Sequence, residues 1–289
     1  MVIILIFMVI FMKSILPIEL QNGIFLDPKN AKKTGEKYNL QYTTNHPFPH
    51  IVLDNLLPRA ITEDLLANFP EQPLRKDKIF DGYYEFNKRQ ISPYYCKARA
   101  TEIFMFFNSA PFLQFLEGMT GIEGLISDPY FEGAGYHEIT AGGKLGVHAD
   151  FRIHKKLHLA RRLNLLVYLN QDWQNEYGGM LELWKTDMSE AVHKILPIFN
   201  RCVVFNTDAD SFHGHPDALT CPPERTRRSV ALYYYTASKH VYEELPNKGT
   251  DFRARNDTEE HEASIAKNKT FFKRLKRLTR KITSNKTDF

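Results

Sequence analysis

Apolar and polar side chains alternate along residues 144–151, which read KLGVHADF. Leu145 and Val147 share one side of an extended chain with the later apolar positions, because successive side chains of a strand point to opposite faces. The other side then carries His148 and Asp150, about 6–7 Å apart along the strand. An imidazole and a carboxylate at this spacing can bind one metal ion as two members of a two-histidine, one-carboxylate triad. The stretch therefore predicts a β-strand and part of a metal site.

A third ligand must come from elsewhere, because one His-x-Asp pair is weak evidence in a chain with 11 histidines. A second pair, in the segment 215–217, contains a proline that cannot donate to a strand ladder, and we interpret this segment as a loop. An apolar strand over 202–206 leads instead toward His213, which lies 63 residues beyond Asp150. We expect His213 to complete the triad.

A separate charged feature is Arg227, which follows His213 by fourteen residues and begins a strand over 227–235. Alternation places Arg227 and Ser229 on one face of this strand and Arg228 on the other. An arginine on a buried strand needs an anion, and its planar guanidinium can pair with a carboxylate through two parallel hydrogen bonds. Ser229 can donate a third from the same face.

The pattern around these motifs is typical of an α+β domain that is mainly β. Before Leu125 it predicts helices, one with Thr62 as its N-cap and its end at Phe69, and one over 97–119. After Leu125, short β-like runs are separated by Gly, Pro, Asn and Asp. These runs cover residues 130–140, 144–151, 163–170, 180–185, 195–206 and 228–236. Helices followed by many strands, without an internal repeat, predict a sandwich or barrel of antiparallel strands.

Taken together, the motifs resemble those of the Fe(II)/2-oxoglutarate dioxygenases, and in particular the prolyl 4-hydroxylase-like branch. The resemblance covers about residues 47–238 and rests on segments that occur in the family's order. The segments are PFPHIVLDN at 47–55, AGGKLGVHAD at 141–150, LLVYLN at 165–170, GGMLELW at 178–184 and FHGH at 212–215. The resemblance implies a double-stranded β-helix, or jelly roll, as the core, with N-terminal flanking helices.

The resemblance also implies what the polar residues do. Fe(II) would bind His148, Asp150 and His213, and the distal carboxylate of 2-oxoglutarate would bind Arg227 with help from Ser229. The implied catalytic residues are the three metal ligands and Arg227.

Two further positions are informative by comparison with the family. Tyr168 occupies the place where some relatives have a tyrosine that contacts the same carboxylate of 2-oxoglutarate. Relatives often carry another tyrosine nine residues before the first ligand histidine, whereas this chain carries Ile139. The resemblance therefore implies no polar cosubstrate or substrate contact from position 139.

The implied activity is hydroxylation of a C–H bond by O2, with release of succinate and CO2 and with ascorbate as the reductant. Because Asp150 is present, a halide is not expected in its place as in the related halogenases, so hydroxylation is favoured. The expected substrate is a prolyl residue or another peptide side chain; a small molecule or a glycan is the alternative. A catalytically silent, cupin-like binding module is the alternative from another class, but such a module does not need three metal ligands and an arginine.

Charge and cysteine content restrict the partners and the compartment. The net charge of +4 is uneven, because residues 264–289 hold nine Lys or Arg and one Asp, a net +8, which leaves −4 for residues 1–263. A mildly acidic body gives no indication of a nucleic-acid partner. The three cysteines are an odd number with no CxxC pair, which indicates free thiols and a reducing, cytoplasmic environment.

The two ends of the chain differ in composition from the rest. We therefore expect an N-terminal apolar leader and polar extension at 1–45, a dioxygenase domain at 46–245, and a polar linker and basic tail at 246–289. The first twelve residues are apolar but fall short of the ~20 needed to span a bilayer. They fit an extension, a weak membrane anchor or signal, or a start-site error. Apolar residues at helical spacing between 271 and 282 fit a solvated helix, or one that contacts the body or a membrane.

Overall fold

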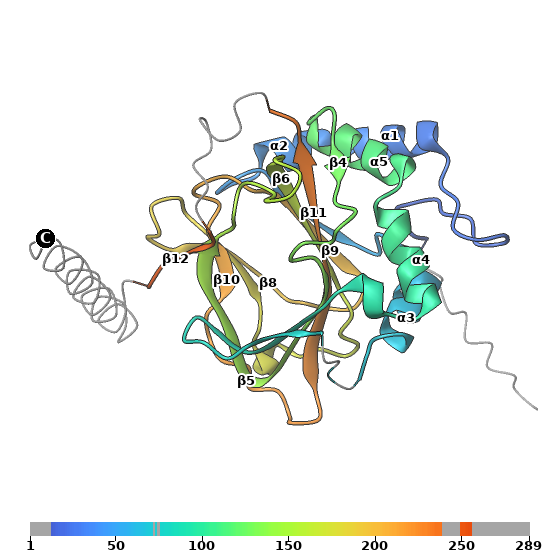
Figure 1. Cartoon of the computed structure of the whole chain (residues 1–289). Coiled ribbons are helices and arrows are strands. Elements are labelled where there is room, and N and C mark those ends of the chain that lie inside the picture. The colour runs from blue at the N-terminus through green and yellow to red at the C-terminus, as the bar shows by residue number, and fades with distance from the viewer. Residues whose placement is uncertain (1–12, 72, 74–75, 239–248, 256–289) are drawn as a thin grey trace, which may run out of the picture.

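The computed structural model describes residues 13–71, 73, 76–238 and 249–255. Its strands form one antiparallel sheet that curls into a half-barrel, with the helices against its outside (Figure 1). The main path through the sheet is β1-β9-β6-β11-β5-β10-β7-β8, and β2, β3, β4 and β12 pair beside it. This is the jelly-roll core with flanking helices that the sequence predicted.

The described strands are β1 His50–Asp54, β2 Lys78–Phe80, β3 Glu85–Ile91, β4 Ile126–Ser127, β5 Gly135–Ala149, β6 Ala160–Tyr168, β7 Leu181–Trp184, β8 Ala191–Ile195, β9 Arg201–Asn206, β10 His213–His215, β11 Thr226–Thr236 and β12 Asp251–Phe252. The described helices are α1 Pro28–Glu36, α2 Asn39–Thr44, α3 Arg59–Ala67, α4 Ala98–Phe107 and α5 Ala110–Thr120, with 3-10 turns η1 Pro93–Tyr95 and η2 Asn175–Tyr177.

The alternation of side chains along β6 separates the core from the interior of the half-barrel. Leu163, Leu165 and Val167 belong to the large apolar core on the helix side. Asn164 and Leu166 point the other way and line an internal cavity. The sheet thus has an outer face that is buried by helices and an inner face that is open to a ligand.

Aromatic rings fill the space between the helices and the outer face of the sheet. Phe104 of α4 packs edge-to-face against Tyr136 of β5, with ring centroids 5.1 Å apart. Phe112 of α5 lies 5.0 Å from Phe107 in the same arrangement. The hydroxyl of Tyr234 donates to the carbonyl of Phe107 at 3.1 Å, so the buried phenol is satisfied. These contacts fix the helices on the sheet and leave the inner face free.

The segment that the sequence analysis treated as a polar extension contributes to this core. Its helices α1 and α2 lie beside α5 (Figure 1). Asp27 caps α1 by accepting from the backbone N–H of Asn30, and Pro28 occupies the first turn. Ala31 and Tyr42 are buried in the main apolar core. The expected boundary near residue 46 therefore divides elements that share one core.

Two predicted helices begin or end at other residues. The helix predicted from Thr62 begins at Arg59, after Pro58, so Thr62 lies inside it and was wrongly assigned as its N-cap. The single helix predicted over 97–119 is in fact α4 and α5. The chain breaks at Asn108, because Pro111 is tolerated only in the first turn of a new helix.

The predicted runs 130–140 and 144–151 are joined in the single strand β5. A bend at Gly142, which has a φ of +75°, lets this strand change neighbours along its length. Near its start, Ile139 lies opposite Arg227 of β11. Near its end, His148 lies opposite His213 of β10. One strand therefore connects the two groups of predicted site residues.

The apolar first twelve residues and the helical pattern over 271–282 lie outside the described residues. In the part of the chain that the structure describes, no helix combines the length and apolar character needed to cross a membrane. Cys96, Cys202 and Cys221 are free thiols, as predicted.

Candidate metal centre

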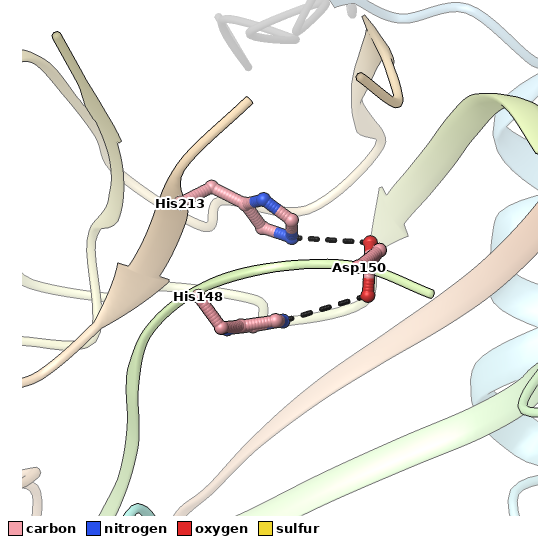
Figure 2. A group of neighbouring side chains, drawn as sticks. All are labelled: His148, Asp150 and His213. Atoms are coloured by element: carbon pink, nitrogen blue, oxygen red, sulfur yellow. Dashed lines mark ion pairs between the residues drawn. The ribbon is translucent and has the colours of Figure 1, made fainter. Parts of the chain in front are cut away.

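The structure brings His148, Asp150 and His213 together at one end of the inner face. His148 is near the end of β5, Asp150 directly follows that strand, and His213 begins β10. One ligand atom from each residue lies within 4.8 Å of the others. Figure 2 shows both imidazole rings directed at the Asp150 carboxylate. Antiparallel pairing of His148 with His213 is what places two residues so distant in sequence side by side.

The hydrogen bonds of both rings leave the correct nitrogen available for a metal. Nδ1 of His148 contacts the carbonyl of Gly146, and Nδ1 of His213 contacts the carbonyl of Ser211, each at 2.9 Å. A carbonyl only accepts, so each Nδ1 carries the proton and each Nε2 keeps its lone pair. These Nε2 atoms lie 3.6 Å and 3.4 Å from oxygens of Asp150, which is longer than an ordinary hydrogen bond. Two lone pairs and a carboxylate facing one point fit a divalent transition metal such as Fe(II).

The charge states of His213 and Asp150 agree with this fit. Burial, reinforced by nearby His148, lowers the pKa of His213 to about 4, so its ring is neutral near pH 7. Burial opposes ionisation of Asp150, but Arg161 and the two imidazoles outweigh it and hold the pKa of Asp150 well below its usual range. The site therefore offers a negative charge from Asp150 and a neutral imidazole from His213.

Asp150 is held in place by two residues of β6 that the sequence analysis did not identify. Its Oδ2 accepts from Nη2 of Arg161 at 3.0 Å and from Nδ2 of Asn164 at 2.5 Å. The Arg161 guanidinium is fully buried and lies over the rings of Phe151 and Tyr233, 4.4 Å and 3.5 Å from their centroids. The available signal was Arg161 and Asn164 themselves, which together with Arg162 are the charged or amide-bearing residues of a mainly apolar strand.

Arg227 lies on the same inner face and is buried without a carboxylate partner among the described residues. Its Nε donates to the carbonyl of Gly179 at 2.7 Å, and its Nη2 donates to the hydroxyl of Tyr168 at 3.3 Å. Gly179 has a φ of +68°, and a Cβ there would lie 2.9 Å from Cδ of Arg227, so a side chain would displace the arginine. Arg228 points to the outer face and donates to Glu138 at 3.1 Å.

A cavity of about 450 Å³ connects the triad with Arg227. Ser229 lines this cavity beside Arg227, whereas Tyr168 reaches the site through its hydroxyl contact with the arginine. Ile139 supplies an apolar part of the wall. The structure thus unites all six predicted site residues around or directly behind one cavity.

The same cavity contains a histidine that the sequence analysis wrongly placed in a loop. His215 is the last residue of β10, and the proline that follows ends this strand without disrupting it. The backbone between His213 and His215 has a bulge relative to β5, so His215 pairs with Leu145. The His-Gly-His alternation was the signal that both rings share one face.

Comparisons with known proteins agree with this geometry. Residues 134–235 match the family model described as the 2OG-Fe(II) oxygenase superfamily. The chain is similar to prolyl 3-hydroxylase OGFOD1 of Mus musculus, with 30% identity over 82 residues that make up 27% of this chain. The match spans only 15% of the length of that curated relative.

Two solved structures show the same fold. A prolyl-4-hydroxylase of Pseudomonas putida matches with a TM-score of 0.50 and 17% identity, covering 70% of this chain and 99% of that one. A prolyl hydroxylase of Trichoplax adhaerens, in complex with a peptide fragment of hypoxia inducible factor, matches with a TM-score of 0.50 and 18% identity, covering 72% and 91%. Residues 134–235 of this chain therefore match the 2OG-Fe(II) oxygenase superfamily, and the chain has the fold of these two prolyl hydroxylases.

Proposed function

We propose that the protein is an Fe(II)- and 2-oxoglutarate-dependent dioxygenase that hydroxylates a prolyl residue or another peptide side chain, with release of succinate and CO2. The observation that carries this proposal is one cavity that joins a two-histidine, one-carboxylate triad to a buried arginine, which has no carboxylate partner in the described part of the chain. A metal at one end and a guanidinium cation at the other would match the two ends of an oxo-acid bound at an iron.

The triad would hold the iron at a fixed position in the cavity. His148 and His213 would supply Nε2 atoms whose tautomers are set by backbone carbonyls, and Asp150 would supply the charge. When bound, Fe(II) supplies the activation of O2 that couples decarboxylation of 2-oxoglutarate to oxidation of a C–H bond. The two β6 donors on Oδ2 of Asp150 keep the carboxylate from rotating out of place.

Arg227 would bind the distal carboxylate of 2-oxoglutarate, with Ser229 as a second donor. The two contacts that Arg227 makes with Gly179 and Tyr168 fix the plane of the guanidinium before any ligand arrives. Burial strengthens a charge-assisted hydrogen bond, because little water competes for it. Apolar Leu181 and Phe205 line the same cavity and help to exclude water.

An open groove beside the cavity supports a peptide substrate. It shares Lys78, Gln90 and Glu132 with the cavity and has a volume of about 440 Å³. Tyr94 and Tyr130 lie along it and are 53% and 45% exposed. Exposed tyrosine rings with lysines beside them can bind an extended peptide, because such a substrate contacts the protein on both sides of its reacting residue. The peptide bound to the Trichoplax relative supports the same substrate class.

We also propose a reductant and a cellular compartment for the reaction. Ascorbate would return the iron to Fe(II) after turnovers in which no substrate is oxidised. Three free thiols suit a reducing compartment, and we propose the cytoplasm.

Anaerobic titration of the purified protein with Fe(II) and then 2-oxoglutarate tests the chemistry without a known substrate. The expected result is a weak visible charge-transfer band that is absent in His148→Ala. The exposed His193 supplies the matched control, because His193→Ala should keep the band. A folded protein that binds Fe(II) but gives no band with 2-oxoglutarate would overturn the proposal.

Peptide specificity is tested afterwards with O2 and a panel of proline-containing peptides. Mass spectrometry should detect one added oxygen atom on a peptide, together with an equal amount of succinate. Turnover of small molecules or glycans in the absence of any peptide turnover would contradict the peptide assignment.

A further inference from the structure

His215 is a buried polar side chain that the mechanism above does not use. Its residue is 2% exposed, and neither ring nitrogen has a hydrogen-bond partner among the described residues. An imidazole always carries at least one N–H donor, and burying that donor without a partner costs free energy. His148 and His213 differ in this respect, because each of their rings already contacts a backbone carbonyl.

The position of His215 indicates where a partner would lie. It lines the cavity that also contains the triad and Arg227, and it shares a strand face with His213 two residues earlier. A Cβ at Gly214 would lie 2.8 Å from the carbonyl of Gly146, so this glycine allows β10 to lie close against β5 between the two rings. The close packing of β10 against β5 thus fixes the position of His215 at the cavity wall.

A distal carboxylate in this cavity would have about four acceptor positions, and two parallel hydrogen bonds from Arg227 and one from Ser229 would leave one of them unfilled. Two of the arginine's N–H groups are already used by Gly179 and Tyr168. Lys88 also lines the cavity, but its ammonium group pairs with Glu85 at 2.6 Å. Ile139 on the wall has no polar atom to offer. Among the described side chains that line the cavity, His215 is the donor whose polar atoms are fully enclosed without a hydrogen-bond partner.

We propose that His215 is a further cosubstrate-binding residue, which donates a ring N–H to 2-oxoglutarate in the cavity. The proposal rests on the proposed function and adds a residue to it. His215 then supplies a polar contact on a wall where Ile139 supplies none. Binding of the dianion would also satisfy a donor that is unsatisfied in the free protein, which favours the bound state.

The test measures 2-oxoglutarate binding to the Fe(II)-loaded protein, without turnover. Anaerobic titration, followed through the visible charge-transfer band, should give a Kd that rises about tenfold or more in His215→Phe, which keeps a flat ring but removes both nitrogens. His215→Gln keeps an N–H donor and should recover at least part of the affinity. If the phenylalanine variant does not fold, His215→Leu takes its place.

Metal binding without 2-oxoglutarate provides the control, because His215 lies close to a metal ligand. The affinity for Mn(II), measured by electron paramagnetic resonance, should be the same in the wild type and in all His215 variants, and thermal unfolding should confirm that each is folded. An unchanged Kd for 2-oxoglutarate in His215→Phe overturns the proposal. An equal loss of Mn(II) affinity also overturns it, since the residue would then act through the metal ligands. Absence of the band in the wild type would instead contradict the proposed function.

Discussion

Two adjacent arginines on the inner and outer faces of β11 differ in whether they have a carboxylate partner. On the outer face, Arg228 and Arg89 both donate to Glu138, and Arg89 also pairs with Asp77, so two carboxylates balance the two arginines. On the inner face, Arg227 lies 5.0 Å from the centroid of the Tyr168 ring but has no carboxylate partner among the described residues. A buried cation that is not neutralised is costly, and the protein keeps it where a ligand can supply the anion. The difference separates an arginine that is paired within the fold from one that, in the proposed function, would bind the ligand.

The largest effect is expected at the triad. Asp150→Ala removes the charged ligand and leaves the guanidinium of Arg161 buried without its partner. We expect loss of measurable 2-oxoglutarate turnover and a fall in unfolding free energy of about 3 kcal/mol. Turnover is measured as succinate, and stability by denaturant unfolding. Asp217→Ala, at the exposed aspartate of the other His-x-Asp pair, is the control, and full turnover in Asp150→Ala would remove Asp150 from the site.

The comparison of the two arginines is tested directly by matched substitutions. Arg227→Ala should raise the KM for 2-oxoglutarate by about 100-fold, because two charge-assisted hydrogen bonds are lost. Arg228→Ala should leave that KM unchanged and lower the unfolding free energy by about 1–2 kcal/mol, because Glu138 loses one donor. Steady-state kinetics and unfolding of both variants give the result. The reverse order of effects would show that the inner and outer assignments are wrong.

Arg161 sharpens the comparison within the inner face, because this arginine, unlike Arg227, has a carboxylate partner in Asp150. Arg161→Lys keeps the charge but removes the planar donor that holds Oδ2 of Asp150. We expect metal affinity to fall about tenfold, measured by Mn(II) binding in the absence of 2-oxoglutarate. Unchanged metal affinity would mean that Asn164 alone is sufficient to orient the carboxylate.

The smallest effect is expected for an ion pair at the surface. Arg201 donates to Asp54 at 2.6 Å, and this hydrogen bond is the main reason why the pKa of Asp54 lies below its usual value. The stability that the pair contributes is therefore present above about pH 4 and is lost as the pH falls through the lower pKa of the folded state. Because Asp54 is half exposed, Asp54→Asn should cost less than about 1 kcal/mol near pH 7. Unfolding of both proteins from pH 7 to pH 2 should show the difference vanish, and a cost of several kcal/mol would show that exposure does not screen this pair.

Much of the site could be predicted because it depends on the period of a strand. Alternation placed His148 with Asp150 and separated Arg227 from Arg228, and both patterns appear in the structure. The same rule could have placed His215 beside His213. It was set aside because a proline follows, although a proline after the last residue of a strand breaks no hydrogen bond within it.

Other features could not be predicted because they depend on contacts between distant segments. Nothing local in β6 shows that Arg161 will meet the carboxylate of Asp150, since the loop between them determines how they approach. The helices α1 and α2 have a polar composition and gain their stability by packing on α5. A helix that is stabilised mainly by tertiary packing leaves a weak signal in its own sequence.

The bend in β5 restricts which parts of the cavity can vary in sequence. Backbone hydrogen bonds of one strand fix the separation between Arg227 and the triad, so neither end of the cavity can move alone. Tyr130 and Lys156, by contrast, project into the neighbouring groove from loops. Loops accept substitutions and insertions that a central strand does not. The selection of targets can therefore diversify while the reaction centre stays the same.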